Sequence, residues 1–379
     1  MTNFLILDVE TTILNKGNPF NPNNQLCYIG YKTYGKNNYT TLKHPFILSD
    51  IQAVVDAHDY LVAFNAKFDC HWLERLGVVL DGIRIWDCQY ASFLFSNQQT
   101  KYPSLNGECE QIGLGSKIDT IKEKYWKNGV DTLDIPYEEM VQYLEQDVNL
   151  TEQLFEYQRK NFPHSKMRLF QLHMEDQVCL REMERNGILY NQEESLKKAE
   201  DVQKQIDGLT TTLLQGYEQC PINFDSTDHL SAYLYGGTIV VESRLPIGVY
   251  KSGQKVGLTR YKIVEHEYKL PRLVEPLPNS ELKKDGLWAT DEKTLRQLKG
   301  SKEFKNRLRM LNERSKLEKL RGTYYKGFPN KIAEMAWTDN TIHSSLNQCT
   351  VVTGRLSSTQ PNQQNIPPEA KRLAISRYN

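Results

Sequence analysis

Short apolar runs alternate with polar residues in the first part of the chain, which is the pattern of β-strands. Later in this part, apolar positions recur every three or four residues, as they do along helices. The predicted elements are, in chain order, strands at 4–9, 27–35 and 39–46, a helix at 51–59, a strand at 61–65, and helices at 67–77 and 135–162. This order predicts a sheet covered by helices, in a mixed α/β domain.

The segment NFPHSK at 161–166 interrupts the helical pattern and predicts a domain boundary, with one domain at 1–165 and a second at 166–379. The second domain is expected to be mostly helical. Its predicted helices cover 165–187, 191–214 and 290–328. Between them, residues 236–288 contain β-branched runs broken by glycine and proline, which predicts hairpins.

Composition indicates an ordinary globular protein, because 39% of the residues are hydrophobic and 25% are charged. Apolar runs are far shorter than the roughly 18–20 residues that span a bilayer. The N-terminal residues MTNFLILDVETT lack the features of a signal peptide, so we expect a cytoplasmic protein with no membrane partner. The seven cysteines form no CxxC pair, so we expect reduced and mostly buried thiols, without disulfides or a zinc site.

Charge is unevenly distributed along the chain, although the net charge is zero. Residues 1–165 contain 14 basic and 21 acidic residues, whereas residues 166–379 contain 33 and 26. An acidic half joined to a basic half is typical of a part that binds metal ions and a part that binds a polyanion.

Two carboxylates lie close together at the end of the first predicted strand, in the segment Asp8-Val9-Glu10. Because side chains alternate along a strand, Asp8 and Glu10 are expected to share one face. Two crowded carboxylates repel each other, and a bound divalent cation removes that repulsion. The alternative is an acidic strand end that only faces solvent.

Two further motifs add acidic groups. Asp69 follows Asn65 at the start of a predicted helix, where it either serves a site or caps the helix. Tyr143 and Asp147 lie four residues apart and therefore share a helix face, unless they are a half-buried tyrosine and a surface carboxylate. Together the three motifs can form an oxygen-rich pocket suited to two Mg²⁺ or Mn²⁺ ions, which promote attack on a phosphodiester.

These three segments resemble the motifs of the DEDD exonuclease superfamily, whose domains have an RNase H-like fold. The last of these motifs has a tyrosine four residues before its aspartate, and in this it resembles the motif of the DEDDy subgroup. The resemblance implies that Asp8 bridges both metal ions, that Glu10 and Asp147 complete the tighter site, and that Asp69 holds the second ion through water. It also implies that Tyr143 orients the attacking water. Thr11, Asn65 and Phe68 are the expected substrate-binding residues at the single-stranded 3′ end of DNA.

The C-terminal part contains TGRLSS at 353–358 and PNQQNIP at 361–367, whose composition alone predicts a loop. These strings resemble the entry to the palm of family A, or polymerase I-like, DNA polymerases, most closely the bacteriophage versions. The resemblance implies a thumb and an incomplete palm after the exonuclease domain. Arg355, Gln364 and Asn365 would then approach the primer–template duplex.

The predicted helix near residue 310 is similar to the thumb helix of that family and is rich in basic residues. Such a helix either binds DNA phosphates or is a solvated face. Its expected DNA-backbone contacts are Lys302, Lys305, Arg307, Arg309, Arg314, Lys316, Lys319 and Arg321. The basic segment KSGQKVGLTRYK at 251–262 is either a further DNA contact or a site for a processivity partner.

In family A polymerases the catalytic aspartates of the palm and the fingers helix follow the segment that matches RLAISRYN at 372–379. We therefore expect that this polypeptide does not polymerise alone and that a separate polypeptide supplies palm and fingers, unless the chain is a truncated product. The sequence favours a proofreading 3′→5′ exodeoxyribonuclease. Two alternatives stay open: a non-enzymatic subunit that clamps DNA, and an RNA exonuclease of the RNase D type.

Overall fold

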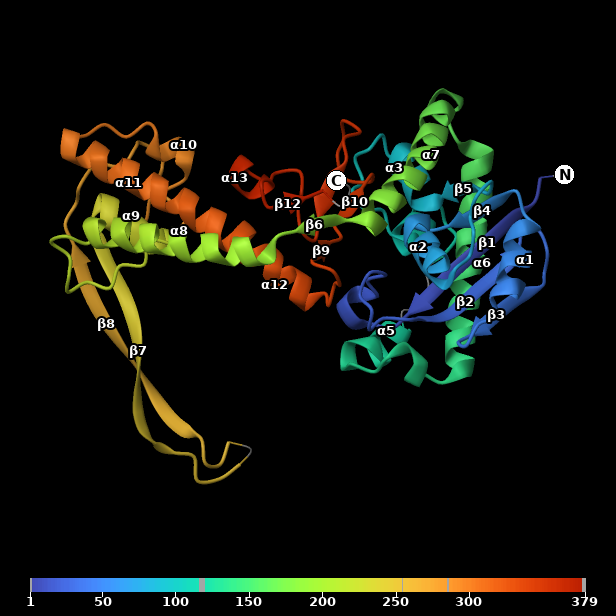
Figure 1. The fold of residues 1–379 in the computed structure, drawn as a ribbon, viewed down its shortest axis with the longest axis horizontal. Helices are drawn as coiled ribbons and strands as arrows, with labels where there is room; N and C mark the ends of the chain where they lie inside the picture. Colours follow the sequence, from blue (N-terminus) through green and yellow to red (C-terminus); the bar gives the residue numbers. More distant parts are fainter. Residues whose placement is uncertain (1, 116–119, 254, 285, 377–379) are drawn as a thin grey trace. The chain divides into compact units, whose positions relative to one another are not determined.

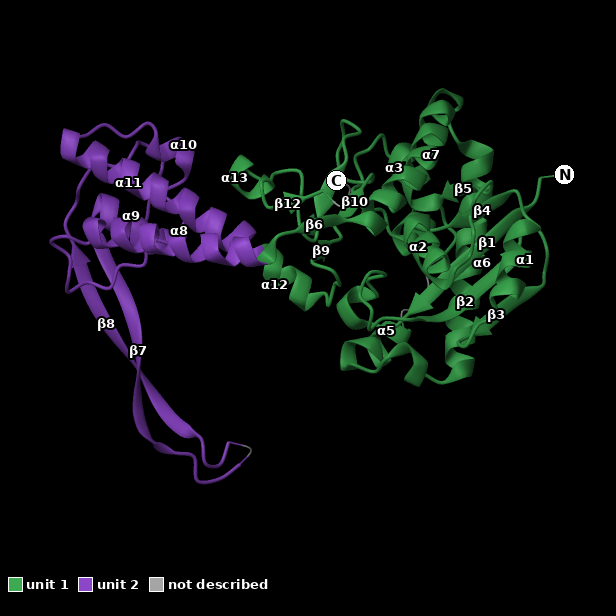
Figure 2. Cartoon of the chain, in the orientation of Figure 1, with its two compact units in different colours: residues 1–192, 328–379 green, residues 193–327 purple. Residues whose placement is uncertain are grey.

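The computed structural model describes residues 2–115, 120–253, 255–284 and 286–376. The chain divides into two compact units (Figure 2). Unit 1 comprises residues 1–192 and 328–379, and unit 2 comprises residues 193–327. The chain therefore leaves unit 1 once, forms unit 2, and returns.

Unit 1 is built on a five-stranded sheet with the order β3-β2-β1-β4-β5. Its strands are β1 (Phe4–Thr11), β2 (Leu26–Thr33), β3 (Tyr39–Lys43), β4 (Tyr60–Ala63) and β5 (Arg84–Asp87). β1, β2 and β3 pair antiparallel, whereas β4 runs parallel to both β1 and β5. The middle strand β1 is thus flanked by one antiparallel and one parallel neighbour.

Helices cover this sheet (Figure 1). They are α1 (Leu48–Asp56), α2 (Ala66–Leu76), α3 (Cys88–Phe95), α4 (Leu105–Gln111), α5 (Thr120–Lys124), α6 (Tyr137–Asn161) and α7 (His164–Asn186), with short 3₁₀ turns η1 (Leu14–Lys16), η2 (Trp126–Asn128) and η3 (Thr132–Asp134). α6 packs across β1, β2, β3 and β4, so its buried face is fixed against the centre of the sheet. Burial of residues such as Leu5, Val62 and Phe155 stabilises this arrangement through the hydrophobic effect.

The C-terminal part of unit 1 contains α12 (Gly327–Glu334), β9 (Thr341–Ile342), β10 (Ser345–Asn347), β11 (Ser357–Thr359), α13 (Pro368–Lys371) and β12 (Ala374–Ile375). β9 and β12 both pair with β6 (Ile188–Tyr190), which follows α7 directly. α7 in turn packs on β5 and α3. These contacts explain why the compact units do not coincide with the predicted domains 1–165 and 166–379.

Unit 2 combines helices with one long hairpin (Figure 1). Its elements are α8 (Gln192–Leu213), α9 (Thr227–Tyr235), β7 (Gly237–Val249), β8 (Thr259–Leu270), α10 (Glu292–Leu295), α11 (Lys302–Lys319) and the π-helical turn η4 (Leu320–Lys326). The pairing of β7 with β8 confirms a hairpin within 236–288. Phe224, Tyr233, Leu295 and Leu311 are among the residues that form its core.

Among the described residues, no helix is both long and apolar enough to cross a membrane. Most of the cysteines are buried, as the sequence predicted, whereas Cys179 is exposed and Cys220 is partly exposed.

Candidate metal centre

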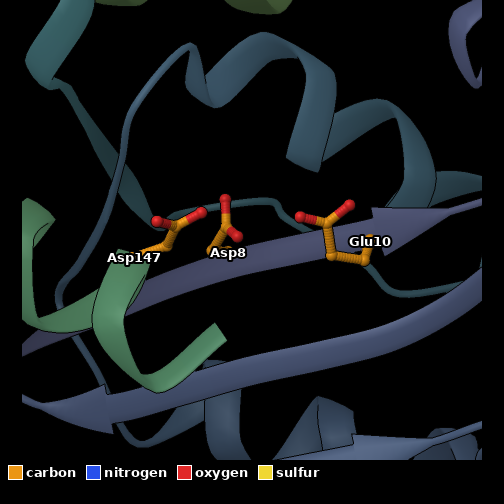
Figure 3. Close-up of side chains that lie close together, drawn as sticks. All are labelled: Asp8, Glu10 and Asp147. Carbon is orange, nitrogen blue, oxygen red and sulfur yellow. The ribbon is translucent and has the colours of Figure 1, made fainter. Parts of the chain in front are cut away.

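β1 brings Asp8 and Glu10 to one side of the sheet (Figure 3). Val9, between them, is buried in the hydrophobic core. This alternation is the one that the strand pattern predicted. The antiparallel pairing of Asp8 with Gly30 and of Glu10 with Tyr28 fixes both residues near the end of β1.

α6 brings Asp147 to the same place (Figure 3). Asp8, Glu10 and Asp147 each offer a carboxylate oxygen, and these oxygens lie within 4.8 Å of one another. Asp147 is buried, whereas Asp8 and Glu10 are half-buried. Three carboxylates so close together, with partial burial, form a strongly anionic site of the kind that a hard divalent cation stabilises.

Asp69 lies in the first turn of α2 and is buried against β1. Its Oδ1 accepts a hydrogen bond from the backbone N–H of Val9 at 3.1 Å. Burial and the negative charge of Asp8 raise the pKa of Asp69 well above its ordinary value. The N-cap alternative is wrong, because Asn65 occupies the N-cap position of α2. Asp69 is outside the group of three whose oxygens lie within 4.8 Å, so its role toward a second ion stays a prediction.

Tyr143 lies one turn before Asp147 on α6, and its ring packs edge-on against Trp126 at 5.6 Å between centroids. Both rings line an open pocket of about 630 Å³ beside the carboxylates. The other lining residues are Glu10, Thr11, Thr12, Ile13, Lys16, Gly17, Phe68, Lys122 and Lys127. The pocket therefore joins an acidic edge to aromatic rings and three lysines.

Two of the three predicted substrate-binding residues, Thr11 and Phe68, line this pocket. Asn65 does not line it. It has a left-handed backbone conformation, and its N–H donates to the Asp87 carboxylate at 3.1 Å. Asn65 and Phe68 line a second pocket, of about 280 Å³, also in unit 1. Phe68 is thus common to both pockets.

Sequence reasoning missed Lys16, Lys122, Trp126 and Lys127, although all four line the pocket beside the carboxylates. Lys122, Trp126 and Lys127 belong to α5 and η2, in a stretch with no clear strand or helix period. The available signal was composition, since KEKYWK at 122–127 interleaves lysines with aromatic residues, as nucleic-acid-binding segments do.

A second buried polar cluster in unit 1 surrounds Glu184 of α7. Its carboxylate contacts Lys67 Nζ at 2.5 Å and His71 Nε2 at 2.6 Å, both on α2, and accepts from the backbone N–H of Leu346. Burial alone raises the pKa of Glu184, but the His71 hydrogen bond and the Lys67 charge outweigh it and hold that pKa below its usual value. Burial lowers the pKa of His71. Because ionised Glu184 only accepts, neutral His71 donates through Nε2.

The predicted DNA-contacting residues of the C-terminal loop, Arg355, Gln364 and Asn365, are all exposed. The loop prediction is confirmed for 353–356 and 361–367, which lie outside helices and strands, but it is wrong for Ser357 and Ser358, which belong to β11. β10 and β11 pair antiparallel and hold the two ends of the first loop together.

The predicted DNA-backbone contacts of α11 divide into two groups. Lys302, Lys305, Arg309, Lys316 and Lys319 are exposed and recur at three-, four- and seven-residue spacings, which places them on one stripe of the helix. Arg307 is mostly covered and donates to Tyr233 Oη at 3.0 Å, and Arg321 donates to Glu318 at 2.7 Å.

Arg314 requires a correction, because it is buried rather than presented to solvent. It donates to the two carboxylate oxygens of Asp225 at 2.8 and 3.2 Å and to Thr210 Oγ1 at 3.0 Å. Its guanidinium also lies over the Phe224 ring. Arg314 therefore joins α11 to the rest of unit 2 and is not available to a DNA backbone.

Part of the chain is similar to a described protein family. Residues 258–377 match the model of DNA polymerase family A. The chain is 28% identical to DNA polymerase I of Synechocystis sp. over 310 residues, which are 80% of this chain and 26% of that protein. It is 25% identical to the DNA polymerase of Bacillus phage SP01 over 339 residues, which are 84% of this chain and 35% of that protein.

The fold is similar to that of the POL domain of Pol1 from M. smegmatis, solved in complex with DNA primer-template and dNTP. The TM-score is 0.66 at 17% identity, and the match covers 97% of this chain and 54% of that one. The chain spans about a quarter to a third of the length of the curated relatives. Residues 258–377 thus match the model of DNA polymerase family A, and the chain is similar in sequence to DNA polymerase I over most of its length.

Proposed function

We propose that unit 1 carries a metal-dependent 3′→5′ exonuclease that removes nucleotides from the 3′ end of DNA, as the proofreading part of a family A DNA polymerase. The observation that carries this proposal is the convergence of Asp8, Glu10 and Asp147, with oxygens within 4.8 Å, from a strand and a helix far apart in sequence. The strand order β3-β2-β1-β4-β5, antiparallel and then parallel, supports an RNase H-like domain.

The carboxylates fit Mg²⁺ or Mn²⁺, since these hard cations prefer oxygen ligands. Asp8, Glu10 and Asp147 would hold one ion, and Asp8 with Asp69 a second. Bound cations would supply Lewis-acid stabilisation of the phosphodiester and lower the pKa of the attacking water.

The protein's own side chains orient and bind the substrate. Tyr143, one turn from Asp147, presents its hydroxyl to the attacking water. Phe68 and Trp126 offer rings on which the terminal bases stack. Lys122 and Lys127 offset phosphate charge at the mouth of the pocket. A frayed, mispaired end reaches such a pocket more often than a paired end, which gives selectivity for mismatches.

The relation to DNA polymerase I favours DNA as the substrate. We propose that the exposed stripe of α11 and the loop residues Arg355, Gln364 and Asn365 bind the primer–template. In that role Lys302, Lys305 and Arg309 contact phosphates without reading sequence.

The proposal is tested with a 5′-labelled primer–template that carries a 3′ mismatch. With Mg²⁺ we expect stepwise shortening and release of 5′-nucleoside monophosphates, and with EDTA we expect none. Single-stranded RNA of the same sequence is expected to be digested much more slowly. Faster digestion of RNA would favour the RNase D-like alternative, and DNA binding without any digestion would favour the clamping subunit.

Tyr143→Phe should slow DNA digestion by on the order of a hundredfold, because it removes the hydroxyl that positions water. The ring and its packing on Trp126 remain, so thermal stability and DNA affinity should match those of the unaltered protein. Single-turnover rates at saturating DNA measure this effect. Tyr137→Phe, an exposed tyrosine six residues earlier on the same helix, is the matched control and should leave the rate unchanged.

A further inference from the structure

The base of the β7–β8 hairpin packs into the core of unit 2, whereas its outer half is exposed to solvent. Ile239 and Leu270, which lie near its base, are buried in the core of the unit. Beyond the pair Glu242–Glu265, every described residue from 243 to 263 except Tyr250 is exposed. At roughly 3.4 Å per residue, Ser243–Val249 extends the ribbon by about 24 Å. An isolated two-stranded ribbon is marginally stable in water, so a partner bound along this half would stabilise it.

All charged residues of the outer half are basic. Residues 243–263 contain five basic residues and no acidic residue. The basic residues are Arg244, Lys251, Lys255, Arg260 and Lys262. The base of the hairpin differs, since Glu242, Glu265 and Glu267 lie there. A uniformly cationic surface of this kind is complementary to a polyanion.

The cations are distributed over both faces of the ribbon. Arg244 lies opposite Ile263, and the next pair, Leu245 with Lys262, points to the other face. Each face therefore carries a cation beside an exposed aliphatic side chain. A flat protein surface would contact one face only. A groove contacts both, and a groove of B-form DNA admits a two-stranded β-ribbon.

We propose that the outer half of the β7–β8 hairpin binds double-stranded DNA by lying in a groove, with its cations on the phosphates of both strands. The inference rests on the proposed function only in that the chain acts on DNA. It uses no residue of the carboxylate site, so the hairpin and the exonuclease are tested separately.

The test measures affinity of the full chain for a short fluorescent duplex in EDTA, where digestion does not interfere. Arg244/Arg260/Lys262→Ala is expected to weaken binding on the order of tenfold and to reduce the slope of log affinity against log salt by about 2–3. Lys197/Lys198/Lys204→Ala on α8 is the control, because it removes the same charge from a solvent-facing helix of the same unit. Its affinity and salt slope should be unchanged.

A second variant removes the ribbon itself. Replacing residues 243–264 by Asn-Gly joins Glu242 to Glu265, which already lie opposite each other, through a two-residue turn. It should melt as the unaltered protein does and lose at least as much duplex affinity as the triple variant. Unchanged duplex affinity and salt slope in both variants would overturn the proposal. So would an equal loss in the α8 control, or hairpin-dependent binding to phosphatidylserine vesicles in place of duplex DNA.

Discussion

Asp8→Asn should lower the rate of 3′-end digestion by about a thousandfold or more. Asp8 belongs to the group of three carboxylates, and its negative charge also raises the pKa of Asp69. Loss of a metal-binding carboxylate removes several kcal/mol of transition-state stabilisation, and each 1.4 kcal/mol or so corresponds to tenfold in rate. Rates are measured with excess enzyme on a mismatched primer–template.

Fold and DNA binding should survive this substitution, because the amide has the shape of the carboxylate and relieves repulsion with Glu10 and Asp147. The rise in melting temperature that Mn²⁺ gives the unaltered protein should be lost, since that rise measures metal binding. Asp81→Asn, an exposed carboxylate in the same unit, should change neither quantity. Undiminished digestion by Asp8→Asn would place the nuclease site elsewhere, and a lower melting temperature in EDTA would indicate misfolding.

Local periodicity predicted most of what positions this centre. Alternation along β1 placed Asp8 and Glu10 on one face, and four-residue spacing placed Tyr143 with Asp147 on one face of α6. Both patterns depend only on residues a few positions apart. The convergence of the strand and the helix required recognition of a family pattern, because backbone periods contain no information about which distant elements meet.

The prediction from residue type was wrong for Arg314, and the packing of α11 explains why. Arg314 was assigned to DNA with its basic neighbours, yet it follows Phe304 and Leu311 on the buried face of α11. Arg314 lies three residues after Leu311, which lies seven residues after Phe304, and this helical spacing was the signal that Arg314 faces inward. Its charge is tolerated there because Asp225 and Glu318 pair with it.

Local sequence patterns could not predict the cluster around Glu184. Glu184 is 117 residues from Lys67 and 162 from Leu346, so no spacing rule connects them. Buried ion pairs depend on tertiary geometry, and a glutamate in an amphipathic helix normally faces solvent. Its burial here becomes understandable only once α2, α7 and β10 are seen to meet.

Glu184→Ala should therefore destabilise the protein by about 3–5 kcal/mol, which is the usual cost of removing one partner of a buried ion pair. The Lys67 ammonium would lose its counter-charge, and the N–H groups of His71 and Leu346 would lose their acceptor. Urea unfolding measures the change. Glu182→Ala, an exposed position on the same helix, should remain within about 0.5 kcal/mol of the unaltered protein.

A double variant separates the charge from the hydrogen bonds. Lys67→Met with Glu184→Gln removes both charges but retains an amide oxygen that accepts from His71 or Leu346. It should lose less stability than Glu184→Ala alone, because no buried charge is left without a partner. Equal losses in the two variants would show that the unpaired charge of Lys67 contributes little to the destabilisation.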